Sequence, residues 1–154
     1  MAILSKRILT DVSRTYHKAC GLRPRYMDLS GNVASGDDAL SALANSRRRR
    51  NYALQESINV GAPYVFSPAP GISSWIVALE NKRMVHGGLI GGEVLTQELP
   101  DTRDETLDYL VAHGMGQEKG EKFLAGLSVW PEIRIQEAVE FLQDTFYQIS
   151  GWKP

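Results

Sequence analysis

Apolar side chains recur every three to four residues at the beginning of the chain, a spacing that predicts an amphipathic helix. This helix is expected over residues 3–20 and ends at Gly21. Its apolar positions are Leu4, Ile8, Val12, Tyr16, Ala19 and Cys20. A short strand is expected over 25–29, and the polar and glycine residues at 30–32 predict a turn after it.

Helical spacing returns between residues 37 and 59, and this segment is expected to begin near Ser35. Arg47 and Arg50 lie on its apolar stripe, which favours a break or an exposed bend over 46–50 and therefore two helical pieces. The alternative is that one arginine turns inward and holds an anionic ligand group through a forked hydrogen bond. Four adjacent helical arginines point in four directions, so the run is not in itself a nucleic-acid motif.

The middle of the chain, residues 61–95, is rich in Val, Ile, aromatic residues, Gly and Pro, which predicts an antiparallel sheet. The expected strands are 63–67, 73–80 and 83–96. Asn81 and Lys82 are expected to form the tight hairpin turn between the second and third strands. The glycine pairs at 87–88 and 91–92 predict a bend, a bulge, or a close approach to the backbone.

Helical patterns return after the sheet. Thr102 and Glu105 form a capping-box pattern for a helix that stops at Gly114. A short helix is expected around 117–125, and a long amphipathic helix over 131–150. No internal repeat or low-complexity linker divides the chain, so residues 1–154 are expected to form one domain of the α+β class.

The charge of the chain is nearly balanced, with 17 Lys and Arg against 18 Asp and Glu and a formal net charge of -1. A strongly basic surface for polyphosphate is therefore not expected. The first twenty residues are charged rather than apolar, so no signal peptide is predicted, and we expect a cytoplasmic protein. No stretch approaches the roughly 20 apolar residues of a membrane span, so no membrane contact is expected.

The residues that usually carry catalysis or bind metals are scattered. His17, His86 and His113 fall in separate elements, and no serine stands in a Gly-x-Ser-x-Gly turn. No two His or Cys residues have metal-ligand spacing, so neither a metal nor another cofactor is expected. Cys20 is the only cysteine, and its place on the apolar stripe predicts a packed helix residue.

Three aromatic residues are the more informative candidates. Tyr64 and Phe66 alternate onto one face of their expected strand, and Trp75 lies on the next strand. They either pack in the core or form the wall of a small-molecule pocket, because such pockets are mostly apolar with a few polar groups. The polar groups proposed for such a pocket are Ser74, His86 and Glu93.

Three segments resemble the PocR sensory domain in their order and spacing. They are YALQE at 52–56, GAPYVFSPAPGI at 61–72 and GLIGGEVL at 88–95. Residues 110–152 also follow the short helices and the terminal helix of that family, so the resemblance covers nearly the whole chain. It implies a PAS-like fold, in which an antiparallel sheet is cupped by helices around a ligand cavity, with long amphipathic helices at both ends.

The residues that match the family pattern are Tyr64, Gly71, Gly92 and Glu93, and the resemblance implies that they lie near the pocket. The chain departs from the pattern at 67–70, where many members have a Cys-His pair and this chain has SPAP. Cysteine-dependent ligand or metal binding is therefore not carried over.

The resemblance implies an input domain that senses a small organic molecule such as a diol, a sugar or another hydrocarbon derivative. Such domains precede AraC-type DNA-binding domains, histidine kinases or cyclic-nucleotide signalling domains. We therefore expect the N-terminal part of a longer, homodimeric transcription regulator, whose helix over 131–150 transmits the signal and whose DNA contact is made by a separate domain. The alternatives are a sensor domain of a histidine kinase or of another signalling protein, and a dimerisation module without a ligand. A small enzyme with Glu93 or His86 as general base is a further alternative, but no enzyme is expected.

Overall fold

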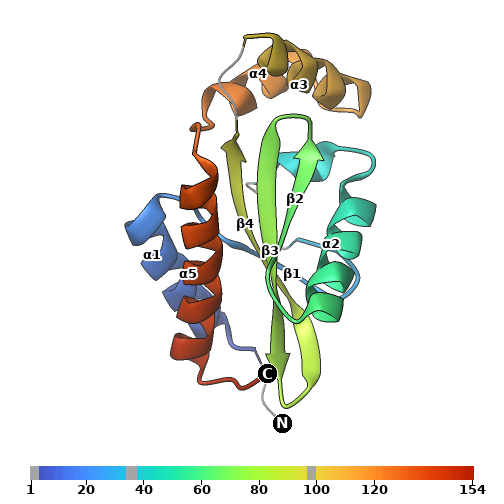
Figure 1. The fold of residues 1–154 in the computed structure, drawn as a ribbon. Coiled ribbons are helices and arrows are strands. Elements are labelled where there is room, and N and C mark those ends of the chain that lie inside the picture. The colour runs from blue at the N-terminus through green and yellow to red at the C-terminus, as the bar shows by residue number, and fades with distance from the viewer. Residues whose placement is uncertain (1–3, 34–37, 97–99) are drawn as a thin grey trace.

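The computed structural model describes residues 4–33, 38–96 and 100–154. Five α-helices and a four-stranded antiparallel sheet make up this described part, which confirms the α+β class (Figure 1). The elements in chain order are α1 (Lys6–Cys20), β1 (Arg25–Met27), the 3-10 helix η1 (Ala39–Ala42), α2 (Ser46–Val60), β2 (Tyr64–Ala69), β3 (Ile72–Asn81), β4 (Met84–Leu95), α3 (Pro100–Ala112), α4 (Gln117–Ala125) and α5 (Glu132–Ser150).

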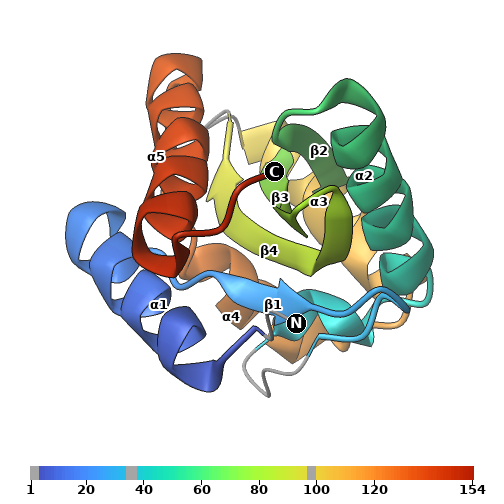
Figure 2. The ribbon, with the colours of Figure 1, turned by 90° about the horizontal axis from the view of Figure 1, so that it is seen from below.

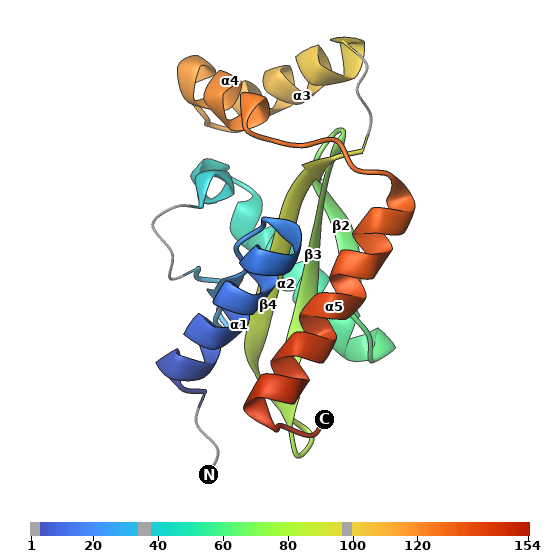
Figure 3. The same ribbon diagram turned by 90° about the vertical axis from the view of Figure 1, so that its left-hand side faces the viewer.

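The strands are ordered β1-β4-β3-β2, so that the short first strand pairs with the last one. Helices α1 and α5 lie side by side on one face of the sheet, and α2 covers the other face (Figure 2). Helices α3 and α4 form a separate layer beyond one end of the strands (Figure 3). The sheet therefore has two different environments, one on each face.

The core between the sheet and the α1–α5 pair is centred on Trp75, which is fully buried. The indole Nε1 of Trp75 donates a hydrogen bond to the Tyr16 hydroxyl at 3.1 Å, and that hydroxyl donates to the carbonyl of Ala138 at 3.0 Å. Burial raises the pKa of Tyr16 far above its ordinary value, so this hydroxyl stays protonated and serves as a donor. One tyrosine thus connects α1, β3 and α5.

The opposite face of the sheet packs Ile76 and Ile90 against Ala53 and Leu54 of α2, with Met27 beside them. Alternation along a strand explains the division, because Trp75 and Ile76 are adjacent and point to opposite faces. A further apolar cluster lies under the α3–α4 layer. Its buried members are Leu40, Leu43, Ala69, Ile72, Leu95, Leu110, Met115 and Leu124.

The first and last helices of the described chain lie close to their predicted ranges, with small differences at their ends. The Ser5 Oγ accepts a hydrogen bond from the amide of Ile8 and caps α1, and Gly21 ends it in the left-handed region at φ 80°. The helix predicted over 117–125 is α4, and the helix predicted over 131–150 begins one residue later.

The hairpin turn is one residue away from its predicted place. Asn81 still pairs with Met84, and the two turn residues are Lys82 and Arg83, with φ of 52° and 65°. A two-residue turn with positive φ at both positions fits the twist of a hairpin, and here it is made by two non-glycine residues. The sequence rule that favours Asn in such turns therefore misplaced this one.

The glycine pairs of β4 do what their pattern predicts. The pairing of β3 with β4 shifts register between Ser73 and Ser74 and again between Ala78 and Glu80. Gly91 is a close approach as well, because a Cβ there would lie 2.0 Å from the Nε1 of Trp75. The strand remains continuous through both pairs.

Two predictions about helix boundaries are wrong. The bend expected over 46–50 is the first part of α2, and the chain breaks earlier, between η1 and Ser46, although two helical pieces do occur. The capping box expected from Thr102 is not at a helix start, because α3 begins at Pro100, and proline suits a first turn where its missing N–H has no partner to lose. The predicted start near Ser35 lies outside the described residues.

Candidate functional site

Four charged side chains meet on the α2 face of the sheet. Arg25 comes from β1, Asp38 precedes η1, Arg50 belongs to α2 and Glu93 lies near the end of β4. Asp38, Arg50 and Glu93 are buried and Arg25 is nearly so, with 11% of its side chain exposed. The two positive and two negative charges cancel, which lets the group lie inside the protein. We call it the buried ion-pair network.

Arg50 forms a forked hydrogen bond with the chain's own carboxylate at Asp38. Its Nη2 donates to Oδ1 at 2.8 Å and its Nη1 donates to Oδ2. The hydroxyl of Ser41 donates to the same carboxylate and accepts from Arg50 at 3.0 Å. One arginine of the run, Arg50, does turn inward and form a forked hydrogen bond, but the anion that it holds is Asp38 of the chain itself and not the ligand group that the sequence alternative named.

Arg25 connects Asp38 to the sheet. It grips Glu93 with two hydrogen bonds of 3.0 and 2.7 Å, and its Nη1 also donates to Asp38 at 2.9 Å. The Ser74 hydroxyl lies 3.0 Å from Glu93 and 2.8 Å from the carbonyl of Gly91. Within the described residues, the Nε of Arg25 is buried without a hydrogen-bond partner.

The surroundings of Asp38 and Arg25 favour their ionised forms. Burial by itself raises the pKa of Asp38, but the hydrogen bond from Arg50 and the charges of Arg25 and Arg50 outweigh it, so this pKa lies below its ordinary value. Burial alone lowers the pKa of Arg25, but the charge of Glu93, the hydrogen bonds to Glu93 and the charge of Asp38 together outweigh it and raise that pKa. The network therefore holds η1, α2, β1 and β4 together through charge-assisted bonds.

A hollow of about 390 Å³ lies on the outside of α2, where this helix meets β2. We call it the α2–β2 groove. Its lining residues are Arg48, Arg49, Tyr52, Tyr64, Phe66 and Ser67. Tyr52 is 60% exposed and packs edge-to-face against Tyr64, with 6.4 Å between ring centroids. The groove therefore combines aromatic walls with two arginines.

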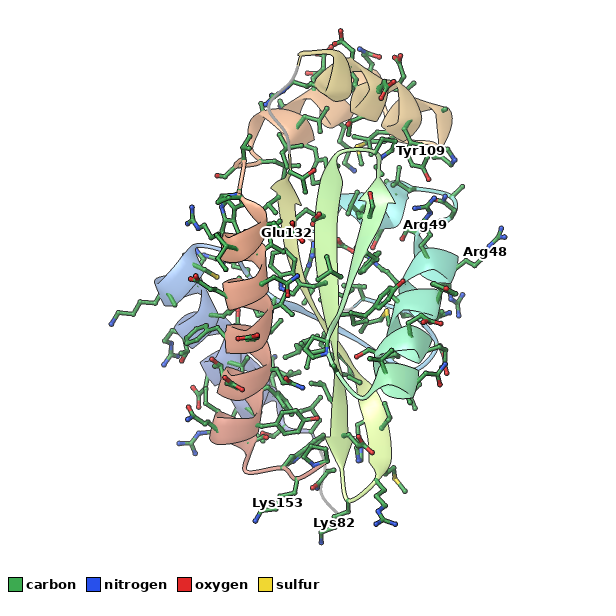
Figure 4. All side chains as sticks on the ribbon, viewed as in Figure 1. Arg48, Arg49, Lys82, Tyr109, Glu132 and Lys153 are labelled. Carbon is green, nitrogen blue, oxygen red and sulfur yellow. The ribbon has the colours of Figure 1, made fainter. Side chains whose placement is uncertain are left out.

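Arg49 is positioned by β2 and by α3. Its Nη1 donates to the carbonyl of Ser67 at 2.6 Å, and its guanidinium lies 5.7 Å from the centroid of the Tyr109 ring. Figure 4 shows Arg49 directed toward Tyr109 and Arg48 extending outward from α2. Asn45 in turn donates to the Tyr109 hydroxyl at 2.9 Å, which joins the beginning of α2 to α3. These contacts connect the groove to both α2 and α3.

The six residues proposed from the sequence fall in four places. Tyr64 and Phe66 line the α2–β2 groove, whereas Ser74 and Glu93 belong to the buried ion-pair network. Trp75 lies on the other face of the sheet, stacked on Trp130 with 6.2 Å between centroids. His86 lies near the end of the chain, with its ring centroid 4.8 Å from that of Trp152. They do not form one pocket.

Two residues that the family pattern added are glycines with positive φ. Gly71 lies in the turn between β2 and β3, and Gly92 contacts the backbone around Ser74. Gly92 is paired with Ser74, beside the network, and neither glycine lines the groove.

The sequence interpretation missed Arg25, Asp38 and Tyr52. Arg25 carried a usable signal, since it shares a strand face with the apolar Met27, and a charge on a buried face needs a partner. Asp38 gave no local signal, because its partners come from distant segments.

The other hollows are less suited to a small organic ligand. One of about 590 Å³ follows α1, but apart from Leu9 its lining is polar or charged: Lys6, Thr10, Ser13, Arg14, His17, Lys18 and Arg23. Among residues 4–33, 38–96 and 100–154, no three His, Cys, Asp or Glu side chains gather as metal ligands. No helix in this part of the chain has the length and apolar character that a membrane crossing requires.

Comparison of the chain with protein-family models, with curated proteins and with solved structures finds no match.

Proposed function

We propose that this protein is a sensory input domain that binds a small organic molecule and transmits its presence to an output partner. The α2–β2 groove carries the proposal, because its hollow of about 390 Å³, lined by the exposed Tyr52 and the half-buried Tyr64 and Phe66, matches the size and lining of ligand sites. An antiparallel sheet with helices against both faces supports the PAS-like arrangement that the resemblance to PocR domains implies.

The groove is connected to the C-terminal helix by a continuous series of contacts. Arg49 of the groove and Arg50 of the network are neighbours in α2, and the network reaches Glu93 of β4. The end of β4 is bonded to the segment before α5, through Leu95 N to Ser128 O at 2.8 Å and Trp130 N to Leu95 O at 2.9 Å. A ligand that prefers one arrangement of α2 would shift α5 along this route.

The output partner follows from the same proposal. Helix α5, which the contacts from β4 reach, is the element that would pass the signal to a DNA-binding domain of the AraC type or to a histidine kinase. The α1–α5 layer would be the dimer surface, and DNA would be contacted only by the separate output domain.

A thermal-shift screen of the purified chain against diols, sugars, sugar acids and short carboxylates tests the proposal. A ligand at one hundred times its Kd adds about 2.7 kcal/mol to the stability of the folded state. Tyr64→Ala should remove the shift while the variant stays folded. Phe141→Ala changes an exposed aromatic side chain on the other face of the sheet and should keep it. A shift that survives Tyr64→Ala contradicts the groove as the site.

A dimerisation module without a ligand is the second candidate. The exposed Ile133 and Phe141 on α5 favour it, because large apolar side chains on an outer helix suit a protein interface. Analytical ultracentrifugation distinguishes the two: a tight dimer that Ile133→Asp dissociates, together with no hit in the screen, supports the module and contradicts the sensor.

A further inference from the structure

We propose that the α2–β2 groove selects a small organic anion with a flat ring. The ring lies on Tyr52, Tyr64 and Phe66, and the acid group is held by Arg49 with help from Arg48. The inference rests on the proposed ligand-sensing function and names the chemical class of its ligand.

The charges of the groove are uncompensated. No carboxylate of the described residues lies within 4.0 Å of the guanidinium of Arg48 or Arg49. Arg49 donates to the neutral carbonyl of Ser67, which uses one of its five N–H donors. A carboxylate, phosphate or sulfonate matches the remaining fork of donors, and planar arginine is suited to hold such groups with two parallel hydrogen bonds.

The position of these arginines in α2 adds a second argument. The first turn of the helix contains Arg47, Arg48 and Arg49 and no acidic residue. Positive charge at a helix N-terminus is unfavourable, since the backbone dipole already makes that end positive. A bound anion beside this turn would offset both the arginine charges and the dipole.

The aromatic wall of the groove favours a ring as the non-acidic part of the ligand. Tyr52 comes from α2, whereas Tyr64 and Phe66 come from alternate positions of β2 and so share a face of that strand. These rings leave little polar lining apart from Ser67 and the arginines. A compound with one or two rings and one acid group suits a space of about 390 Å³, whereas a sugar without charge would give the two arginines no anionic partner.

The test is an NMR titration of the full chain with matched pairs of probes. The acids are benzoate, phenylacetate and 4-hydroxybenzoate, each compared with its neutral amide, and acetate serves as an acid without a ring. We expect at least one ring acid to shift the amide resonances of 48–52 and 64–67. Its amide and acetate should bind at least about tenfold more weakly, since hydrogen bonds to charged groups are the stronger ones.

Variants of the arginines locate the acid group. Arg49→Gln should weaken binding about tenfold or more and Arg48→Gln less, whereas Arg49→Lys should fall between because it keeps the charge and loses the fork. Arg7→Gln removes an exposed arginine of α1, on the other face of the sheet, and should leave binding unchanged. Thermal unfolding of each variant confirms that it remains folded.

The outcomes separate the two proposals. Equal binding of acid and amide, or binding that survives Arg49→Gln, overturns the anion and leaves the sensor. Ring acids that shift resonances of α1 and not of the groove overturn the site. If neither these probes nor any compound of the wider screen binds, the proposed function fails and the inference with it.

Discussion

Arg50 and its neighbours Arg48 and Arg49 occupy consecutive positions of one helix, yet they lie in opposite environments. Arg50 is 3% exposed and is bound to a buried carboxylate, whereas Arg48 and Arg49 line an open groove without any carboxylate partner in the described chain. A helix turns by about 100° per residue, so adjacent residues of the same type reach different sides. The comparison teaches that one arginine run can serve both the fold and recognition.

The largest loss of folding stability is expected from a substitution in the buried ion-pair network. Arg50→Ala leaves Asp38 as a buried carboxylate that only Arg25 can neutralise, and breaking such a pair costs about 3–5 kcal/mol. Urea unfolding of the variant measures this loss. Arg48→Ala is the matched control and should change the free energy of unfolding by less than about 0.5 kcal/mol, as exposed substitutions usually do. Equal losses in the two variants would contradict the division of α2 into an inner and an outer side.

The aromatic residues also divide between the core and the groove. A substitution of the core residue Trp75 should give the second-largest loss of stability. Trp75→Phe keeps a ring in the core but removes the indole N–H that donates to Tyr16, and we expect a loss of about 1–3 kcal/mol. Tyr64→Phe, in the groove, should cost no more than about 0.5 kcal/mol. Thermal unfolding followed by circular dichroism compares the two. A larger loss for Tyr64→Phe would contradict the assignment of Trp75 to the core and of Tyr64 to the groove.

Acid titration distinguishes the network from surface charges. The pKa of Asp38 is lowered from an ordinary value of 3.8, so the stability that it adds is complete above that pH and is lost as the pH falls through its folded pKa. The free energy of unfolding of the wild type should therefore fall steeply below about pH 4. Asp38→Asn, although less stable at neutral pH, should show a shallower fall.

Asp11→Asn is the control for this titration, because Asp11 forms only an exposed pair with Arg14 at 3.8 Å. Its acid profile should follow that of the wild type. Identical profiles for the wild type and Asp38→Asn would show that the network does not govern acid stability.

The two sides of α2 also show how much of the fold could be predicted from the sequence. The apolar period placed α1, α4 and α5 within a few residues, because helix spacing is a local property. An inward-turned arginine was one of two open alternatives. The apolar spacing indicated both Arg47 and Arg50, of which only Arg50 is buried, and it could not identify Asp38 as the partner. Pairing of residues that are far apart in the chain depends on the sheet order β1-β4-β3-β2, which no local spacing contains.

The candidate site was partly accessible for the same reason. Alternation along a strand brought Tyr64 and Phe66 together and put them on one face, as β2 has them. Trp75 was grouped with them because it is aromatic and lies in the next strand. Side chains of two paired strands point to the same face only when their residues are directly opposite or an even number of positions apart. Trp75 is paired with Val65, which lies between the two aromatic residues and points to the other side.

The smallest effect on stability, and the sharpest on recognition, is expected from Tyr52→Ala. Tyr52 is mostly exposed and its described ring contact is with Tyr64, so its loss should change the free energy of unfolding by less than about 0.5 kcal/mol. It also forms one wall of the groove, so binding of a ring acid should weaken severalfold, and binding of acetate should not change. Isothermal titration of the variant with both probes measures the two effects. If Tyr52→Ala lowers stability by several kcal/mol and leaves ring-acid binding intact, the outer side of α2 belongs to the fold and the groove is not a site of recognition.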